Sequence, residues 1–299
     1  MAQQIPVDPS CVVADEGSDG TMTLTPDLAY QRLLLVNVVY FGMPDAGSGR
    51  WVLIDAGVPG TYHTIRNAAR KRFGAESRPA AIVMTHGHFD HIGALKDLAE
   101  HWDVPIYAHE LELPYLDGRS SYPPPDPTVG GGLMARLSPL YPRGPIDVSQ
   151  WLRPLPSDRS VPGMPGFHWI PTPGHSPGHV SFWRELDRTL IVGDAFVTTS
   201  QESAYGVATQ EPELHGPPMY YTQDWIAAKK SVERLAALEP ELVVTGHGRA
   251  MRGSEMRHAL NLLASRFDEV AVPEQGRYVD EPAIADRSGT VHVPPPSRR

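Results

Sequence analysis

The feature that most constrains this chain is a run of three histidines and one aspartate within six positions, His86-x-His88-x-Asp90-His91. The run follows directly on the apolar stretch 80–84, whose composition and length predict a buried β-strand. At this chain's composition, such a run would arise by chance with a probability of about 10⁻³. Imidazole and carboxylate together form the ligand set of hydrolytic transition-metal sites, so the run predicts a metal site at the end of a strand.

The composition is that of an ordinary globular protein with a sizeable core. Of the 299 residues, 41% are hydrophobic and 20% are charged, and the net charge is −9. Because sequence-independent nucleic-acid binding needs a Lys/Arg footprint, we expect no nucleic-acid partner. The single cysteine, Cys11, excludes an intrachain disulfide and a Cys-rich zinc site. Any metal must therefore be held by histidines and carboxylates.

The chain shows neither targeting nor membrane-spanning segments. Its first ten residues contain no basic region and no apolar stretch, so we expect no signal peptide. The longest apolar run, 33–43, is interrupted by Asn37 and is too short to cross a bilayer. We therefore expect a cytoplasmic protein without a membrane partner.

Strand-like and helix-like stretches alternate in both halves of the chain. Apolar, β-rich stretches occur at 33–41, 51–54, 80–84, 105–108, 166–170, 179–183, 189–192 and 242–245. Helical spacing occurs at 61–73, 92–101 and 222–238, and in a final helix that ends near 270 and has Ser254 as its expected N-cap. The alternation predicts sheets covered by helices, of class α+β. Since no linker requires a boundary, we expect one domain over residues 1–299.

Three segments lack a clear period. Residues 118–150 are rich in Pro, Gly and Tyr, and they are either a disordered surface insertion or a lid over a functional site. A second irregular stretch covers 197–221. The tail after Arg277 has no period, and we expect it to be loosely held.

Three further polar residues stand at strand ends or in glycine-rich turns: His175, Asp194 and His247. The neighbouring glycines permit tight turns and close backbone approach, and a strand end can aim a side chain into a cleft. Each residue alone could be an ordinary turn residue. Together with the run at 86–91, they predict that ligands from distant parts of the chain meet in one site.

In order and type, these motifs resemble those of the metallo-β-lactamase superfamily, in its dinuclear hydrolase branch. The resemblance covers roughly residues 30–270, and it rests on Asp55 after a strand, the 86–91 run, the P-G-H turn at 173–175, the G-D pair at 193–194 and the G-H pair at 246–247. It implies an αββα sandwich of two packed mixed β-sheets flanked by helices, with the functional site at one edge.

The resemblance also implies a site for two divalent metal ions. The first ion would be held by His86, His88 and His175, the second by Asp90, His91 and His247, and Asp194 would bridge them. Zinc is the expected metal, while iron and manganese stay open because these ligands do not choose among the three. Asp90 would also carry a proton to the leaving group, and Asp55 would accept an N–H from a ligand histidine. His179 is expected to support a ligand or the fold rather than to bind metal.

These assignments predict a metal-dependent hydrolase in which a metal-bridging hydroxide attacks the carbonyl of a carboxylic ester, lactone or thioester. β-Lactamases with a cysteine ligand are excluded, because Cys11 lies outside every motif. Acyl-homoserine-lactone lactonases share most of the motifs, but they have a tyrosine three residues after the bridging aspartate, where this chain has Val197. A phenol could come instead from one of three tyrosines in the second irregular stretch, Tyr205, Tyr220 and Tyr221. The basic C-terminal pattern of glyoxalase II-type thioesterases is not found.

Other reactions suit the same ligands. The main alternative is hydrolysis of phosphodiesters or phosphotriesters, with β-lactam hydrolysis as a minor activity. Iron-dependent redox chemistry and a non-catalytic metal scaffold are further hypotheses, and the complete ligand set disfavours the scaffold. The Leu, Met, Tyr and Pro content of the irregular segments favours a small-molecule substrate with an apolar acyl or aryl group. A homodimer is left open.

Overall fold

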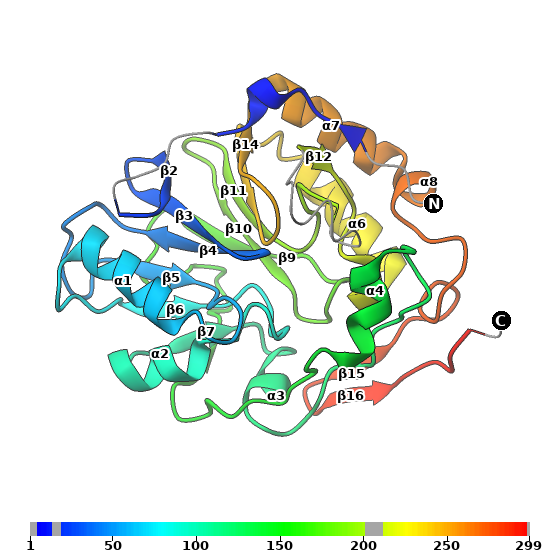
Figure 1. Cartoon of the computed structure of the whole chain (residues 1–299), viewed down its shortest axis with the longest axis horizontal. Coiled ribbons are helices and arrows are strands. Elements are labelled where there is room, and N and C mark those ends of the chain that lie inside the picture. The colour runs from blue at the N-terminus through cyan, green and yellow to red at the C-terminus, as the bar shows by residue number, and fades with distance from the viewer. Residues whose placement is uncertain (1–4, 14–18, 201–211, 298–299) are drawn as a thin grey trace.

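The computed structural model describes residues 5–13, 19–200 and 212–297. In this part of the chain, two β-sheets face each other and helices cover their outer faces (Figure 1). The first sheet has the strand order β2-β3-β4-β5-β6-β7-β8, and the second has the order β14-β13-β11-β10-β9. The predicted αββα sandwich of class α+β is confirmed.

The strands differ in length but run through both halves of the chain. The first sheet contains β2 (Met22–Thr25), β3 (Leu28–Leu33), β4 (Val36–Phe41), β5 (Val52–Ile54), β6 (Ala81–Val83), β7 (Ile106–Ala108) and β8 (Leu152–Pro154). The second contains β9 (Phe167–Pro171), β10 (Val180–Arg184), β11 (Thr189–Gly193), β13 (Leu242–Thr245) and β14 (Met251–Arg252). Two small antiparallel pairs lie outside them: β1 (Ile5–Pro6) with β12 (Glu213–Leu214), and β15 (Ile284–Asp286) with β16 (Gly289–His292).

The helices flank the sheets on both sides. They are α1 (Tyr62–Phe73), α2 (Leu95–Trp102), α3 (Leu113–Leu116), α4 (Leu133–Leu137), α6 (Trp225–Ala236), α7 (Gly253–Ser265) and α8 (Phe267–Val270). Short 3₁₀ turns occur at η1 (Pro9–Cys11), η2 (Ser138–Leu140) and η3 (Met219–Tyr221). In Figure 1, α1 and α2 lie beside the first sheet, whereas α6 and α7 lie beside the second.

Alternating side chains of the central strands enter two different cores. In β4, Val38 and Tyr40 pack with the residues of α1 and α2, whereas Val39 and Phe41 pack between the sheets. This is the period of two that a strand imposes, with both faces buried. The second sheet repeats the pattern, because its outer residues pack with α6 and α7. Both faces of each sheet are thus apolar, so the polar site can form only at an edge.

Two sequence expectations about individual elements are wrong. The stretch 33–41 is not one strand, because the chain turns at residues 34–35 between β3 and β4. Leu34 adopts a φ of 61° there and is 78% exposed, so the turn lacks the Gly or Asn that would have signalled it. Ser254 is not an N-cap, because α7 already begins at Gly253 and its N-cap is Arg252.

Two of the irregular segments, 118–150 and the described part of the tail after Arg277, are integrated into the fold. Within 118–150, the side chains of Tyr122, Asp126 and Ala135 are buried. The tail after Arg277, expected to be loosely held, contains the β15–β16 hairpin beside α3, and the Tyr115 and Thr290 hydroxyls lie 3.1 Å apart. The strands of this hairpin are too short to give a recognisable period. Asp286 and Gly289 pair where the chain turns between them.

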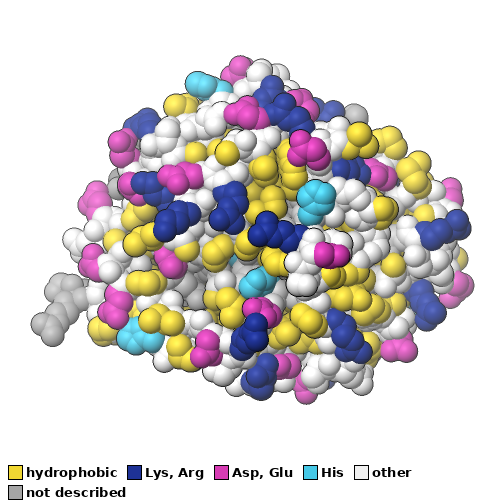
Figure 2. All heavy atoms as spheres, turned by 180° about the vertical axis from the view of Figure 1, so that it is seen from behind, with side chains coloured by type: hydrophobic (Ala, Val, Ile, Leu, Met, Phe, Trp, Pro, Cys, Tyr) yellow, Lys and Arg dark blue, Asp and Glu magenta, His cyan; other side chains and the backbone are white. Residues whose placement is uncertain are grey.

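The outer surface carries short helices and charged side chains of both signs. In the described part of the chain, the helices are too short or too polar to traverse a lipid bilayer. Acidic and basic side chains are intermixed over the face shown in Figure 2.

The packing beneath α1 generates a stability prediction. Trp51 is fully buried, stacks on Phe73 with ring centroids 4.5 Å apart, and donates to Ser77 Oγ at 2.8 Å. Trp51→Ala should lower the free energy of unfolding by about 3–5 kcal/mol, because it leaves a cavity in the core. Urea denaturation followed by circular dichroism, with a chelator present throughout, measures this change.

The matched control is Leu186→Ala, since Leu186 is 93% exposed. Its free energy of unfolding should change by no more than about 0.5 kcal/mol. Equal transition midpoints for the two variants would contradict the assignment of Trp51 to the core.

Candidate metal centre

The site is formed where strands of both sheets end. Asp55 follows β5, the 86–91 run follows β6, Asp194 follows β11 and His247 follows β13. The pairs β5–β6 and β11–β13 are parallel, so their carboxyl ends lie at the same edge of each sheet. His175 comes from the turn between β9 and β10. The structure therefore brings together all the residues that the sequence predicted for the site.

Three histidines form the first group. His88 Nδ1 lies 3.0 Å from His86 Nε2 and 2.9 Å from His175 Nε2, and all three side chains are buried. Burial lowers the pKa of His175 to about 3 and holds the pKa values of His86 and His88 well below their usual value. These rings are therefore neutral, which is the form that coordinates a metal ion.

The second group consists of Asp90, His91 and His247. Asp90 Oδ2 lies 3.4 Å from His247 Nε2. Asp90 is the most exposed member of the whole cluster, although only 7% of it is accessible. Burial raises the pKa of the Asp90 carboxyl, with His91 and His247 acting in the opposite direction.

Asp194 lies between the two groups. Its Oδ2 is 3.5 Å from His175 Nε2 and 3.1 Å from His247 Nε2, and its Oδ1 is 3.5 Å from His91 Nε2. Although burial opposes the charge, His247 and His91 hold the pKa of Asp194 well below its usual range. The carboxylate is thus ionised and in reach of both groups.

The donor set fits divalent metal ions. Each of the groups His86/His88/His175, His86/His91/Asp194 and Asp90/His91/His247 offers ligand atoms within 4.8 Å of one another. Among the described residues, the buried atoms His91 Nε2 and Asp194 Oδ1 have no hydrogen-bond partner. Leaving a buried polar atom unpaired costs about 1–3 kcal/mol, more if it is charged. A cation between these atoms would remove that cost.

Four of the histidines have a hydrogen-bond partner at the other ring nitrogen, which fixes the ring orientation. The pairs are His86 Nδ1 with Thr85 Oγ1 (3.0 Å), His91 Nδ1 with Asp55 Oδ2 (2.9 Å), His175 Nδ1 with Thr222 Oγ1 (3.4 Å) and His247 Nδ1 with the Leu35 carbonyl (2.6 Å). Asp55 therefore lies where the expected acceptor for a ligand histidine belongs. Asp55 and Asp194, opposing the effect of burial, also hold the pKa of His91 well above its usual value.

Sequence reasoning missed several of these supporting groups. The Leu35 carbonyl belongs to the backbone and carries no residue signature. Asn37 was noted only as an interruption of an apolar run, yet its Nδ2 donates to the carbonyls of Thr245 and Gly248 on either side of His247. A polar residue inside an otherwise apolar strand was the available signal.

His179 supports the cluster without joining it. Its Nε2 accepts a hydrogen bond from the Asp194 backbone N–H at 2.8 Å, and its Nδ1 lies 2.8 Å from Thr172 Oγ1. Both ring nitrogens are therefore occupied, and burial lowers the pKa of His179 to about 4.

Aromatic side chains pack against the first group. The ring of Tyr221 stacks on His88 with centroids 4.6 Å apart, and Phe89 stacks on Tyr141 at 5.3 Å. Tyr220 contacts both Tyr141 and Tyr221. The Tyr221 hydroxyl is buried without a hydrogen-bond partner among the described residues, and burial together with the charge of Asp90 raises its pKa.

Tyr205, another of the tyrosines considered as a source of a phenol, lies outside the described residues.

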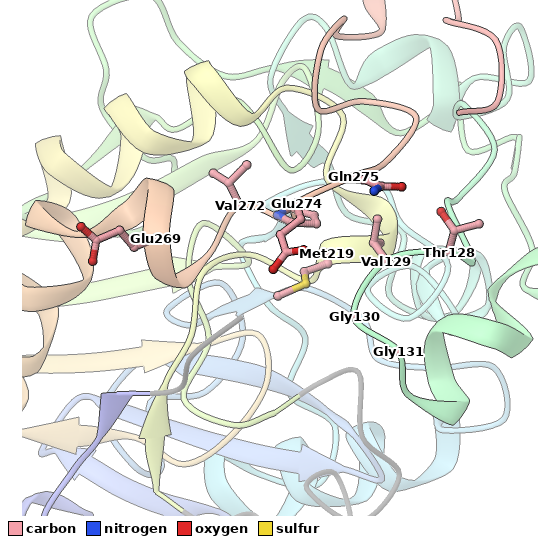
Figure 3. Close-up of a pocket in the computed structure, with 10 residues that line it drawn as sticks. Thr128, Val129, Gly130, Gly131, Met219, Glu269, Val272, Glu274 and Gln275 are labelled. Atoms are coloured by element: carbon pink, nitrogen blue, oxygen red, sulfur yellow. The ribbon is translucent and has the colours of Figure 1, made fainter. Parts of the chain in front are cut away.

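A cavity of about 330 Å³ is lined by residues that are close in sequence to these aromatic residues, such as Met219, and by none of the predicted ligands (Figure 3). Its walls come from residues 128–131, from Met219, from Glu269 and from residues 272–275. Both irregular segments therefore line a hollow, and the chain after α8 completes it.

A family model decides the family. The model described as the metallo-beta-lactamase superfamily matches residues 32–247 of this chain. The chain belongs to that superfamily. As a member of it, the protein is a metallo-hydrolase, and its His/Asp cluster is typical of a dinuclear metal site.

Relatives and solved structures agree with this assignment. The chain is 46% identical over 255 residues to the probable metallo-hydrolase YflN of Bacillus subtilis, covering 85% of this chain and 94% of the relative. It is 26% identical to the solved structure of TTHA1623 in a di-iron-bound form, with a TM-score of 0.50, over 81% of this chain and 97% of the other. A beta-lactamase domain protein from Burkholderia ambifaria, 18% identical with a TM-score of 0.58 over 89% of this chain and 81% of the other, shares the fold.

The unpaired donor atoms generate a prediction about metal addition. Adding Zn²⁺ to chelator-treated protein should raise the free energy of unfolding, because the folded cluster binds the ion and the unfolded chain binds it less well. A concentration one hundred times the Kd should add about 2.7 kcal/mol per site. Thermal unfolding with graded Zn²⁺ measures the effect.

The control variant is His292→Ala, because His292 lies far along the chain in the β16 strand and pairs with Glu281. It should keep the full response to Zn²⁺, whereas His88→Ala should lose a large part of it. An identical response in both variants would contradict the location of the site.

Proposed function

We propose that the protein hydrolyses a carboxylic ester, lactone or thioester with two divalent metal ions, most readily zinc. His86, His88 and His175 would hold one ion, Asp90, His91 and His247 the other, and Asp194 would contact both. When bound, two such ions lower the pKa of water and polarise the substrate carbonyl. The observation that supports two ions rather than one is the position of Asp194, whose carboxylate lies within 3.5 Å of His175 in one group and of His91 and His247 in the other.

The residues around the cluster would divide the remaining tasks. Asp55 fixes the ring of His91 through the hydrogen bond at Nδ1, so that Nε2 faces the cluster. His179 holds the backbone of Asp194 by accepting a hydrogen bond from its N–H. Asp90 is the cluster member closest to solvent, which suits a carboxylate that passes a proton to the leaving group.

The observation that favours a carbonyl substrate is the aromatic packing on the ligand loop. Tyr221 lies on His88, and Phe89 and Tyr141 stack next to them. Aromatic rings beside a metal site favour a substrate with an apolar acyl or aryl group over a polyanionic one. The net charge of −9 points in the same direction.

The test is a substrate panel with metal-loaded protein: an aryl ester, a lactone, a thioester, a phosphodiester, a phosphotriester and a β-lactam. We expect the highest kcat/KM among the first three. His88→Ala and Asp194→Ala should each lower it by more than about 100-fold and should also lower bound metal, since they remove ligands rather than outer partners.

His63→Ala serves as the control, because His63 is an exposed residue of α1 outside the three ligand groups. It should keep both the rate and the metal content. Turnover of phosphorus esters alone would transfer the proposal to the alternative reaction class, and turnover without any metal would refute it.

A further inference from the structure

One fully buried carboxylate, Glu112, joins two loops that carry metal ligands. Its exposed fraction is 0%. Oε2 accepts hydrogen bonds from the Gly87 backbone N–H at 3.0 Å and from the Tyr122 hydroxyl. Oε1 accepts from Ser176 Oγ and from the Gly178 backbone N–H, both at 2.8 Å. Each oxygen thus holds one loop.

The contacts of Glu112 fall beside the ligands of one group, although the 86–91 run also supplies Asp90 and His91. Gly87 lies between His86 and His88, and Ser176 follows His175. The carboxylate therefore links the backbone between His86 and His88 to the turn that carries His175. The other group is supported elsewhere, because His91 binds Asp55 and His247 binds the Leu35 carbonyl.

The chemistry at this position requires a carboxylate. Its four partners all donate, and an ionised carboxylate accepts through two oxygens without offering a proton. The approach is close on both sides: a Cβ added at Gly178 would lie 2.8 Å from Glu112 Cγ, and one at Gly87 would lie 2.8 Å from the Tyr122 hydroxyl. Glycine at both positions lets the loops close around Glu112.

Tyr122 extends the same network to the metal ligands. Its ring contacts His88 with centroids 4.5 Å apart, and it stacks on Tyr115 at 3.8 Å. Its hydroxyl also accepts from the Gly87 N–H at 2.9 Å. The 118–150 segment, to which Tyr122 belongs, is thereby fixed against the ligand loop.

We propose that Glu112 is a positioning residue that sets the geometry of the His86/His88/His175 group and thereby determines its affinity for a divalent ion, with Tyr122 as its partner. The inference rests on the proposed metal-dependent function. It differs from a general contribution to stability, because only one of the two ligand groups depends on Glu112.

The decisive variant is Glu112→Gln. Whichever way the amide lies, its NH₂ faces a backbone N–H, either of Gly87 or of Gly178, and that loop loses its acceptor. Affinity for the ion of the three-histidine group should fall about 10- to 100-fold, the usual effect of removing a partner behind metal ligands. At chelator concentrations where the wild type keeps two zinc ions, the variant should keep one.

Metal content after dialysis against graded chelator, measured by mass spectrometry, provides the readout without any activity assay. Adding His247→Ala to Glu112→Gln should remove the remaining ion, because that histidine belongs to the other group. Tyr122→Phe retains the carboxylate and deletes one donor. It should therefore lose the same ion at a chelator concentration above that for Glu112→Gln and below that for the wild type. It decides the question if Glu112→Gln fails to fold.

Asp126→Asn is the matched control. Asp126 is also a buried carboxylate that accepts from backbone and hydroxyl donors, those of Thr128 and the Arg277 N–H, but it contacts neither ligand loop. We expect a lower melting temperature with two zinc ions retained.

The outcomes separate the two proposals. Wild-type protein that binds no metal would overturn the proposed function together with this inference. Wild-type protein with two ions, and unchanged retention of both in Glu112→Gln and Tyr122→Phe, would overturn the role of Glu112 alone. Equal loss from both groups, matched by Asp126→Asn, would also overturn it, because it would reveal a general loss of stability.

Discussion

The structure depends on the burial of seven ionisable side chains at one edge of an otherwise apolar sandwich. Five are histidines and two are aspartates, and all are buried. Burying charge is costly unless it is paired, so most of the rings and carboxylate oxygens need partners among the surrounding groups. Asp194 makes the most contacts of this kind, because its ionised carboxylate faces histidines of both groups.

The two sheets are therefore connected through polar groups at this edge as well as through the apolar core. Asn37 in β4 of the first sheet donates through its side chain to the carbonyls of Thr245, at the end of β13, and of Gly248, in the loop that follows; its own N–H donates to the Gly246 carbonyl at 2.7 Å. A Cβ at Gly246 would lie 1.9 Å from Asp194 Oδ1. Only glycine fits at this position, so the strand end can approach the Asp194 carboxylate closely.

Much of this arrangement could be predicted from the sequence because the ligands follow recognisable strands. The run after β6 and the pairs at Asp194 and His247 each end an apolar stretch, and their side-chain chemistry is distinctive. The supporting groups could not be found in this way. Glu112 is one acidic residue among several, and its importance comes from contacts with residues 25 and 64–66 positions away. The turn at Leu34 was missed because neither of its residues, Leu34 and Leu35, is a typical turn former.

In that turn, one residue orients a metal-ligand histidine and its neighbour faces the solvent. The backbone carbonyl of Leu35 holds His247, while the neighbouring Leu34 side chain projects into solvent. Since every amino acid has the same carbonyl, residues at the tip can be exchanged without removing the acceptor of the histidine. The hairpin between β3 and β4 is thus a place where the sequence can diversify beside the site while the orientation of a ligand is inherited unchanged.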